Sequence, residues 1–133
     1  MTHKGGCLCD TVRYEFDELV SPIAMCHCSM CRKASGSAFG VNASVSGFRV
    51  TAGREAITEY QSSQAKWRAF CSLCGSPLYA RLDTKPEHIR VRLGTLDTPL
   101  EEKPQAHIYA SSKAHWDAIV DDLPQYPGRE PGR

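Results

Sequence analysis

Seven cysteines in three short groups constrain this 133-residue chain more than any other feature of its sequence. The groups are Cys7 and Cys9 in GGCLCD, Cys26, Cys28 and Cys31 in CHCSMC, and Cys71 and Cys74 in FCSLCG. Cysteines clustered at such spacings favour metal coordination over disulfide bonds in a reducing compartment, and an odd number would leave one thiol over. The chain is therefore predicted to fold around thiolate metal sites.

Length and charge limit the class of protein. A chain of this length is expected to form one domain, residues 1–133. Sixteen basic and fifteen acidic residues give a net charge of +1, which offers no electrostatic case for nucleic acid or for an anionic membrane. The N-terminal MTHKGGCLCD has no signal-peptide-like apolar stretch, and no run of about eighteen apolar residues occurs. We therefore expect a soluble cytoplasmic protein.

Short segments with alternating apolar residues predict a mainly β fold. The clearest are TVRYEF (11–16) and HIRVRLG (88–94), in which Arg90 and Arg92 occupy the face opposite the apolar residues. Three further strand-like segments are AITEY (56–60), KWRAF (66–70) and PLYARL (77–82). Because hydrophobic residues make up 41% and aromatic residues only 8%, the core is expected to be small and to need metal for part of its stability.

Helix is expected only in short pieces. Residues 29–35 could form one turn after the middle cysteine group. The segment SSKAHWDAIVDDL (111–123) has serines available as a cap and apolar residues near one face, which predicts a short helix near the C-terminus. The last residues, 127–133, have the sequence PGREPGR and no apolar residue to bury, so a frayed tail is expected there.

The last cysteine group predicts half of a structural zinc site. In Cys71–Gly75, two cysteines three positions apart precede a glycine, so the backbone can wrap a metal ion and point its N–H groups at the sulfurs. Cys7 and Cys9 are the natural second pair and would join the first strand region to a later hairpin. The middle group then keeps three cysteines, and three protein ligands plus one exchangeable position are usual for a catalytic zinc site.

Spacing alone leaves other divisions open. The middle group could borrow a cysteine from another group, or a histidine could close it as a second structural site. His27 is a poor candidate, because in an extended segment its side chain would point away from a metal ion shared by its two neighbours. The other histidines lack diagnostic ligand spacing; they are His3, His88, His107 and His115.

Two cations follow the middle group directly. Arg32 and Lys33 could offset the charge of an anionic site or bind a carboxylate of a small thiol, although such residues are usually solvated. His27 and Lys33 are also the candidates for an acid or base, because they adjoin the cluster.

Taken together, the three groups resemble the glutathione-dependent formaldehyde-activating enzyme family. The family's pattern is Cys-x-Cys, then Cys-x-Cys-x-x-Cys, then Cys-x-x-Cys-Gly, matched here by GGCLC, by CHCSMC followed by RK, and by FCSLCGSPL. Toward the C-terminus, AHIYASSKAHW and DDLPQY also resemble the family's closing segment. The similarity runs from about Gly5 to Tyr126, which is nearly the whole chain.

This resemblance implies a β-tent fold, in which antiparallel sheets are built around zinc, with one structural and one catalytic ion per chain. The residues that match structural ligands are Cys7, Cys9, Cys71 and Cys74, and those that match catalytic ligands are Cys26, Cys28 and Cys31. The implied activity is that of a carbon–sulfur lyase. It joins formaldehyde to the thiol of glutathione, giving S-hydroxymethylglutathione for detoxification.

A three-thiolate zinc site with an open position also suggests a mechanism on chemical grounds. Such an electron-rich site accepts a further soft ligand readily, so a substrate thiol would be held as the reactive thiolate beside a small aldehyde. One alternative is the same chemistry on another small thiol or electrophile. Another is a non-catalytic zinc module that binds a protein, which the near-neutral charge and the lack of an extra domain disfavour. The oligomeric state is not predicted.

Overall fold

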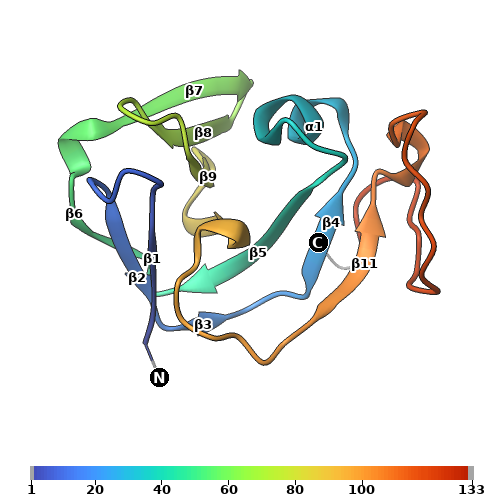
Figure 1. Ribbon diagram of the computed structural model, residues 1–133, viewed down its shortest axis with the longest axis horizontal. Helices are drawn as coiled ribbons and strands as arrows, with labels where there is room; N and C mark the ends of the chain where they lie inside the picture. Colours follow the sequence, from blue (N-terminus) through green and yellow to red (C-terminus); the bar gives the residue numbers. More distant parts are fainter. Residues whose placement is uncertain (1, 132–133) are drawn as a thin grey trace. The chain divides into compact units, whose positions relative to one another are not determined.

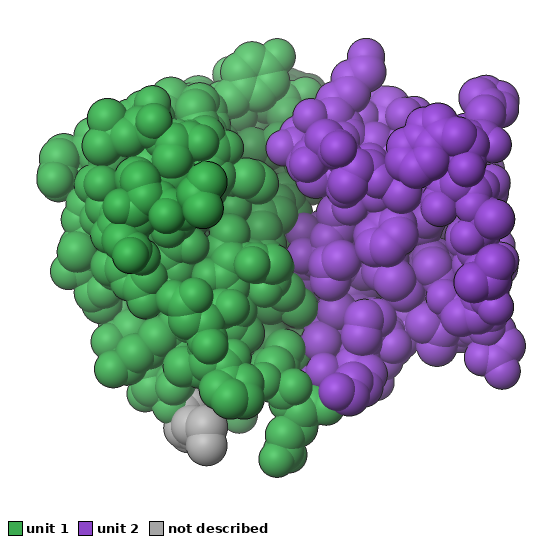
Figure 2. Space-filling view, viewed as in Figure 1, with its two compact units in different colours: residues 1–21, 43–101 green, residues 22–42, 102–133 purple. Residues whose placement is uncertain are grey.

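The computed structural model describes residues 2–131, which are mainly β-strand. These residues belong to two compact units, coloured separately in Figure 2. Unit 1 comprises residues 1–21 and 43–101, and unit 2 comprises residues 22–42 and 102–133. The expected mainly β class is confirmed, whereas a single domain over residues 1–133 stays a prediction. No helix within residues 2–131 has the length and apolarity needed to cross a membrane.

Unit 1 contains two sheets. The smaller has the strand order β1 (His3–Gly6), β2 (Arg13–Phe16) and β6 (Arg49–Ala52), paired antiparallel. The larger has the order β5 (Gly40–Ser46), β10 (Lys85–Arg92), β9 (Pro77–Leu82), β8 (Lys66–Cys71) and β7 (Ile57–Ser63). The short β3 (Glu18–Leu19) pairs with β5, and two 3-10 turns are η1 (Arg54–Ala56) and η2 (Leu93–Thr95). The strands predicted at 56–60, 66–70 and 77–82 are therefore present.

The core of unit 1 includes the apolar face of TVRYEF. Val12, Tyr14 and Phe16 are buried there, as their alternation predicts, and the Tyr14 hydroxyl lies 2.7 Å from Thr95 Oγ1. Cys7 and Cys71 belong to the same buried cluster. The core of this unit is thus continuous with the first and last cysteine groups.

Unit 2 is built on β4 (Ile23–Cys26), which has a neighbour on each side. The first residues of β5 pair with it antiparallel, and β11 (Pro104–Ile108) pairs with it parallel, an exception to the antiparallel expectation. The α-helix α1 (Ser29–Ser35) follows β4 almost at once and ends at Gly36, whose φ of 66° is left-handed (Figure 1). The middle cysteine group therefore lies at a strand-to-helix junction.

The helix expected over residues 111–123 is wrong. Within that range the structure has only the end of the 3-10 turn η3 (Ala110–Ser112), followed by irregular backbone. The physical reason lies in the apolar residues: Trp116 and Val120 are 74% and 92% exposed and Ala114 alone is buried in this range, so the segment has no continuous apolar face packed on a core. Within residues 2–131 the α-helix is α1, where the sequence suggested a single turn.

The C-terminal strap, defined as residues 121–128, runs beside β11. The His107 amide donates to the Pro124 carbonyl and the Tyr126 amide donates to the His107 carbonyl, both at 2.9 Å. Gly128, in the segment expected to be frayed, accepts from the Tyr109 amide at 2.9 Å. Of that segment, residues 132 and 133 lie outside the described part of the chain.

Candidate metal centres

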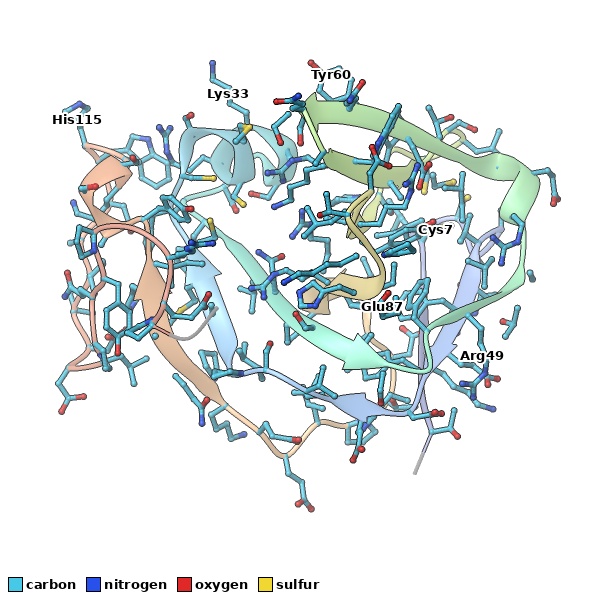
Figure 3. The ribbon with its side chains drawn as sticks, turned by 180° about the vertical axis from the view of Figure 1, so that it is seen from behind. Cys7, Lys33, Arg49, Tyr60, Glu87 and His115 are labelled. Carbon is cyan, nitrogen blue, oxygen red and sulfur yellow. The ribbon has the colours of Figure 1, made fainter. Side chains whose placement is uncertain are left out.

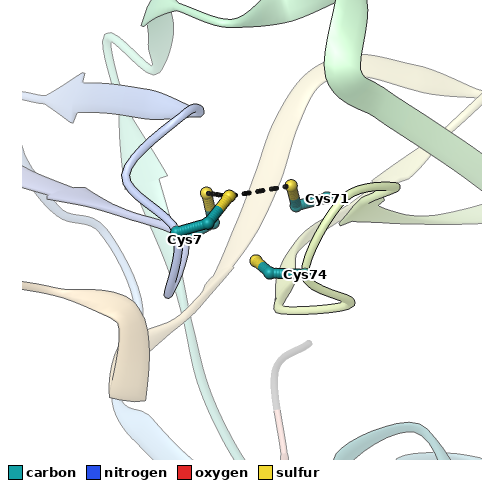
Figure 4. A group of neighbouring side chains, drawn as sticks. Cys7, Cys71 and Cys74 are labelled. Atoms are coloured by element: carbon teal, nitrogen blue, oxygen red, sulfur yellow. Dashed lines mark hydrogen bonds between the residues drawn. The ribbon is translucent and has the colours of Figure 1, made fainter.

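The first and last cysteine groups meet in unit 1, as predicted. Their four sulfur atoms all lie within 4.8 Å of one another, and the group is Cys7, Cys9, Cys71 and Cys74. The Sγ atom of Cys9 is 3.6 Å from that of Cys7 and 3.8 Å from that of Cys71 (Figure 4). A tetrahedral ion with Zn–S bonds of about 2.3 Å places its sulfurs about 3.8 Å apart. The donor set and these spacings therefore fit a zinc ion held by four thiolates.

Two tight turns present these cysteines. After β1, the Asp10 amide donates to the Cys7 carbonyl at 3.1 Å, and Asp10 has a left-handed φ of 65°. After β8, the Gly75 amide donates to the Cys71 carbonyl at 2.7 Å, and the φ of Gly75 is 80°. The glycine after the second cysteine thus supplies the left-handed residue that closes the loop, as a knuckle requires.

Neighbouring hydrogen-bond donors lower the pKa values of these thiols, whereas burial raises them. The Ser76 hydroxyl lies 3.3 Å from Cys74 Sγ and is the main cause that lowers the pKa of Cys74 to about 5. Burial raises the pKa of Cys7 to about 11, although the Val12 amide donates to its sulfur at 3.2 Å. Donors aimed at sulfur favour the thiolate, which is the form that binds metal.

The middle group forms a separate cluster in unit 2. Its sulfurs also lie within 4.8 Å of one another, and no fourth Cys, His, Asp or Glu joins the group within residues 2–131. Cys26 ends β4, Cys28 caps the N-terminus of α1, and the Cys31 amide donates to Cys28 Sγ at 3.3 Å. The division of the cysteines into four and three is therefore present in the structure.

Crowding opposes ionisation of this cluster when only protein groups are considered. The pKa of Cys26 is raised far above its ordinary value, first by hydrogen bonding to Cys28 and Cys31 and then by burial. A divalent cation would reverse this effect, because a coordinating thiol is deprotonated outright. Three soft donors at this separation fit zinc.

Aliphatic and aromatic side chains wall the three-cysteine cluster. Ala24 and Ile108 are buried against it, and Tyr126 of the C-terminal strap packs on it from a half-buried position. Tyr126 is thus a polar group at an otherwise apolar wall.

His27 does not join the metal ligands. It is fully buried, with its ring centroid 5.0 Å from that of Phe39. His27 Nε2 lies 2.8 Å from His107 Nδ1, and His107 Nε2 lies 3.0 Å from Asp121 Oδ2. Burial lowers the pKa of His27, and the hydrogen bond from His107 lowers that of Asp121. His27 is therefore the inner end of a hydrogen-bonded chain.

The other histidines lie elsewhere as well. His88 Nε2 is 3.1 Å from Ser44 Oγ, His3 stacks on Phe16, and His115 is exposed. A histidine that closes the three-cysteine cluster is thus absent from residues 2–131.

The two predicted cations differ in their surroundings. Lys33 is exposed and extends away from α1 (Figure 3). Arg32 is partly buried, and its Nε is a buried atom that has no hydrogen-bond partner among the described residues. Arg32 is therefore the better placed of the two to meet an anionic group.

Sequence reasoning gave no role to Asp121 or Tyr126 of this region, and it considered His107 only as a metal ligand without diagnostic spacing. They lie in AHIYASSKAHW and DDLPQY, the segments whose likeness to a family's closing region was the one available signal. Nothing local in those segments assigns a role to each residue, because their contacts are with a strand far away in sequence.

Comparison with known proteins agrees with this arrangement. The model of a family described as glutathione-dependent formaldehyde-activating enzyme matches residues 2–112, which include every cysteine. A Halomonas elongata protein, provisionally named a glutathione-dependent formaldehyde-activating enzyme, is 30% identical over 128 residues, covering 87% of this chain and 80% of its own length. A crystal structure of a Rhodobacter sphaeroides protein has a TM-score of 0.59 at 30% identity and covers 74% of this chain and 91% of its own.

Proposed function

Because this chain belongs to the glutathione-dependent formaldehyde-activating enzyme family, we propose that it is a zinc-dependent carbon–sulfur lyase that joins a small thiol to a small aldehyde. The leading pair is glutathione and formaldehyde, with S-hydroxymethylglutathione as the product. One observation supports this most strongly: three sulfurs converge in unit 2 without a fourth ligand from residues 2–131. A site that keeps one position open is the form expected for catalysis.

The proposal assigns the cysteines to two ions. The structural ligands are Cys7, Cys9, Cys71 and Cys74, and the catalytic ligands are Cys26, Cys28 and Cys31. When bound to the second group, zinc would supply an exchangeable position that keeps a substrate thiol in its thiolate form. A reducing, cytoplasmic location fits this assignment, because oxidation of either group would remove ligands.

The residues around the catalytic group then have separate tasks. Arg32 binds a carboxylate of the thiol substrate through its guanidinium, with Lys33 as a more distant cation. The Tyr126 hydroxyl donates to the aldehyde oxygen as negative charge develops there. The thiolate sulfur bonds to the carbonyl carbon, the C=O π pair moves to oxygen, and the oxygen takes up one proton, which balances the proton that the thiol released on becoming a thiolate.

Exchange NMR tests this proposal directly. Glutathione and formaldehyde form their adduct spontaneously, so the measured quantity is the exchange rate with and without protein carrying two zinc ions per chain. We expect acceleration by the zinc-loaded protein and none by Cys28→Ser. If the loaded wild-type protein gives no acceleration, the leading pair is wrong, and the same measurement with other small thiols and aldehydes separates another substrate from a non-catalytic zinc module.

A further inference from the structure

We infer that the hydrogen-bonded chain Asp121–His107–His27 is a positioning device that holds the segment carrying Cys26 and Cys28 in the geometry needed for metal binding. The inference rests on the proposed metal-binding role of the three-cysteine cluster. It does not depend on which substrate is used, and it assigns no catalytic contact to the histidines.

The chain leads from the surface of unit 2 into its interior. The Asp121 carboxylate is 42% exposed, whereas the His107 and His27 side chains are almost completely buried. The joining distances are short: 3.0 and 3.1 Å from His107 Nε2 to the two Asp121 oxygens, and 2.8 Å between the imidazoles. Two buried imidazoles are thus connected to one solvated carboxylate.

The ionised Asp121 carboxylate fixes the direction of the first hydrogen bond in this chain. An ionised Asp121 can only accept, so His107 donates through Nε2–H. When each ring carries a single N–H, His107 accepts at Nδ1 from the Nε2–H of His27. His27 Nδ1 lies 4.0 Å from Asp117 Oδ2 and has no hydrogen-bond partner in the described structure. One exposed carboxylate therefore places a proton on His107 Nε2 and connects both buried rings to the surface.

The position of His27 in the sequence connects the hydrogen-bonded chain to the backbone of the cysteine ligands. His27 is the single residue between Cys26 and Cys28, and it follows the last paired residue of β4. Its amide donates to the Ile108 carbonyl at 2.9 Å, and its ring is hydrogen-bonded to His107. Both the backbone and the ring of His27 are therefore held by β11. A change in the orientation of this residue would move the ligands on either side of it.

The ring itself faces away from the sulfurs. The cysteines pack with Ala24 and Ile108, whereas the His27 ring packs on Phe39 and His107. Alternate residues of an extended segment point to opposite faces, which agrees with this separation. His27 thus acts on the cysteines through the backbone and does not touch a ligand of the metal ion.

Cadmium-113 NMR of the fully loaded protein tests the inference, because the two cysteine groups give separate resonances. In Asp121→Ala we expect the resonance of the three-cysteine site to shift and its metal affinity to fall by about 10- to 100-fold, as for other residues that orient ligands. The four-cysteine resonance is the internal control and should not move. Asp122→Ala is the matched control, because Asp122 is the exposed neighbour of Asp121.

Two further variants test the positioning role of the hydrogen-bonded chain. Asp121→Asn retains an acceptor oxygen and should recover most of the affinity lost in Asp121→Ala. His107→Ala should give the larger effect, and if it does not fold, Asp121→Ala decides the question because its carboxylate is at the surface. An unchanged three-cysteine resonance and affinity in Asp121→Ala would overturn the inference. No substrate is present, so this result is independent of the exchange measurement that tests the lyase activity.

Discussion

At the scale of single residues, the three-cysteine cluster has two polar neighbours whose side chains suit different parts of a thiol–aldehyde reaction. Arg32 lies beside Cys31 in sequence, with a buried Nε that lacks a partner among the described residues. Tyr126 reaches the cluster from the C-terminal strap. A guanidinium suits a carboxylate of the substrate, and a hydroxyl suits a developing alkoxide. Their effects on the kinetics should therefore differ.

Replacing Tyr126 by Phe should lower kcat with little change in KM. The ring that packs against the cysteines is retained, and only the hydroxyl is lost. Loss of one donor to a developing oxyanion costs about 100- to 1,000-fold in rate in well-formed sites, and we expect roughly 10-fold here because Tyr126 is only half-buried. Steady-state exchange kinetics measure both constants. A KM change with an unaltered kcat would assign Tyr126 to substrate binding instead.

Replacing Arg32 by Ala should mainly raise KM for the thiol. A charge-assisted hydrogen bond to a carboxylate is worth about 1.5 to 3 kcal/mol, which corresponds to roughly 10- to 100-fold in binding. Lys33→Ala is the control, since the Lys33 side chain extends into solvent on the same helix (Figure 3). Equal effects of the two variants on KM would mean that general charge, and not the position of Arg32, attracts the substrate.

At the scale of secondary-structure elements, the knuckle between β8 and β9 depends on the left-handed backbone of Gly75. A Cβ at this position would meet nothing within 4 Å, so the cost of Gly75→Ala comes from φ alone. That cost is about 1 to 2 kcal/mol of folding free energy. Denaturant unfolding of the zinc-loaded protein measures it. Gly128→Ala is the control, because Gly128 has no left-handed φ and equal room for a Cβ; an equal loss in both variants would contradict the argument.

The elements also show what the sequence could and could not predict. Strands with period-two alternation were predictable, as in TVRYEF, because the pattern is local and one face is buried. The helix expected over residues 111–123 failed because its large apolar residues Trp116 and Val120 are exposed. Arg90 illustrates the same limit in β10: it lies on the face opposite the apolar residues but is buried, 3.3 Å from Ser44 Oγ. Burial of that face depends on distant strands, which alternation does not reveal.

In the candidate site, too, the local features could be predicted from the sequence and the long-range contacts could not. Spacing predicted the three local cysteine groups, because the cysteines within each are a few residues apart, but it left open which groups combine; the structure brings the first and last groups together. The positioning chain could not be predicted, since it requires β11 to pair with β4 in parallel and the strap to bring Asp121 to His107. These contacts join segments that are far apart in sequence.

At the scale of the whole molecule, the two cysteine groups should differ in what their loss does to folding. Cys71 is completely buried in the core of unit 1, and its group joins the turn after β1 to the β8–β9 hairpin. Structural zinc contributes about 10 to 16 kcal/mol, which matches or exceeds the net stability of a small protein. Cys71→Ser should therefore unfold the protein, whereas Cys28→Ser should stay folded with one zinc. Circular dichroism with metal analysis separates these outcomes, and equal unfolding would make both groups structural.

The buried Tyr14 should make the folded protein lose stability in alkaline solution. Burial raises the pKa of Tyr14 from 10.0 to about 12, partly opposed by its hydrogen bond with Thr95. Above pH 10 the unfolded chain releases this proton while the folded protein retains it, so fewer protons are bound in the unfolded state and stability falls as pH rises toward 12. The slope approaches about 1.4 kcal/mol per pH unit, or on the order of 2 to 3 kcal/mol in all.

Tyr14→Phe isolates this contribution in the zinc-loaded protein. The variant loses the hydrogen bond to Thr95, which costs about 1 kcal/mol at neutral pH, but its stability should decline less steeply between pH 10 and pH 12. Tyr60→Phe is the matched control, since Tyr60 is 65% exposed. Urea unfolding at a series of pH values gives both slopes. If the free energies of unfolding of Tyr14→Phe and the wild-type protein decline in parallel with pH, the alkaline loss of stability originates in other groups. The hydroxyl of Tyr14 would then titrate alike in the folded and unfolded chains.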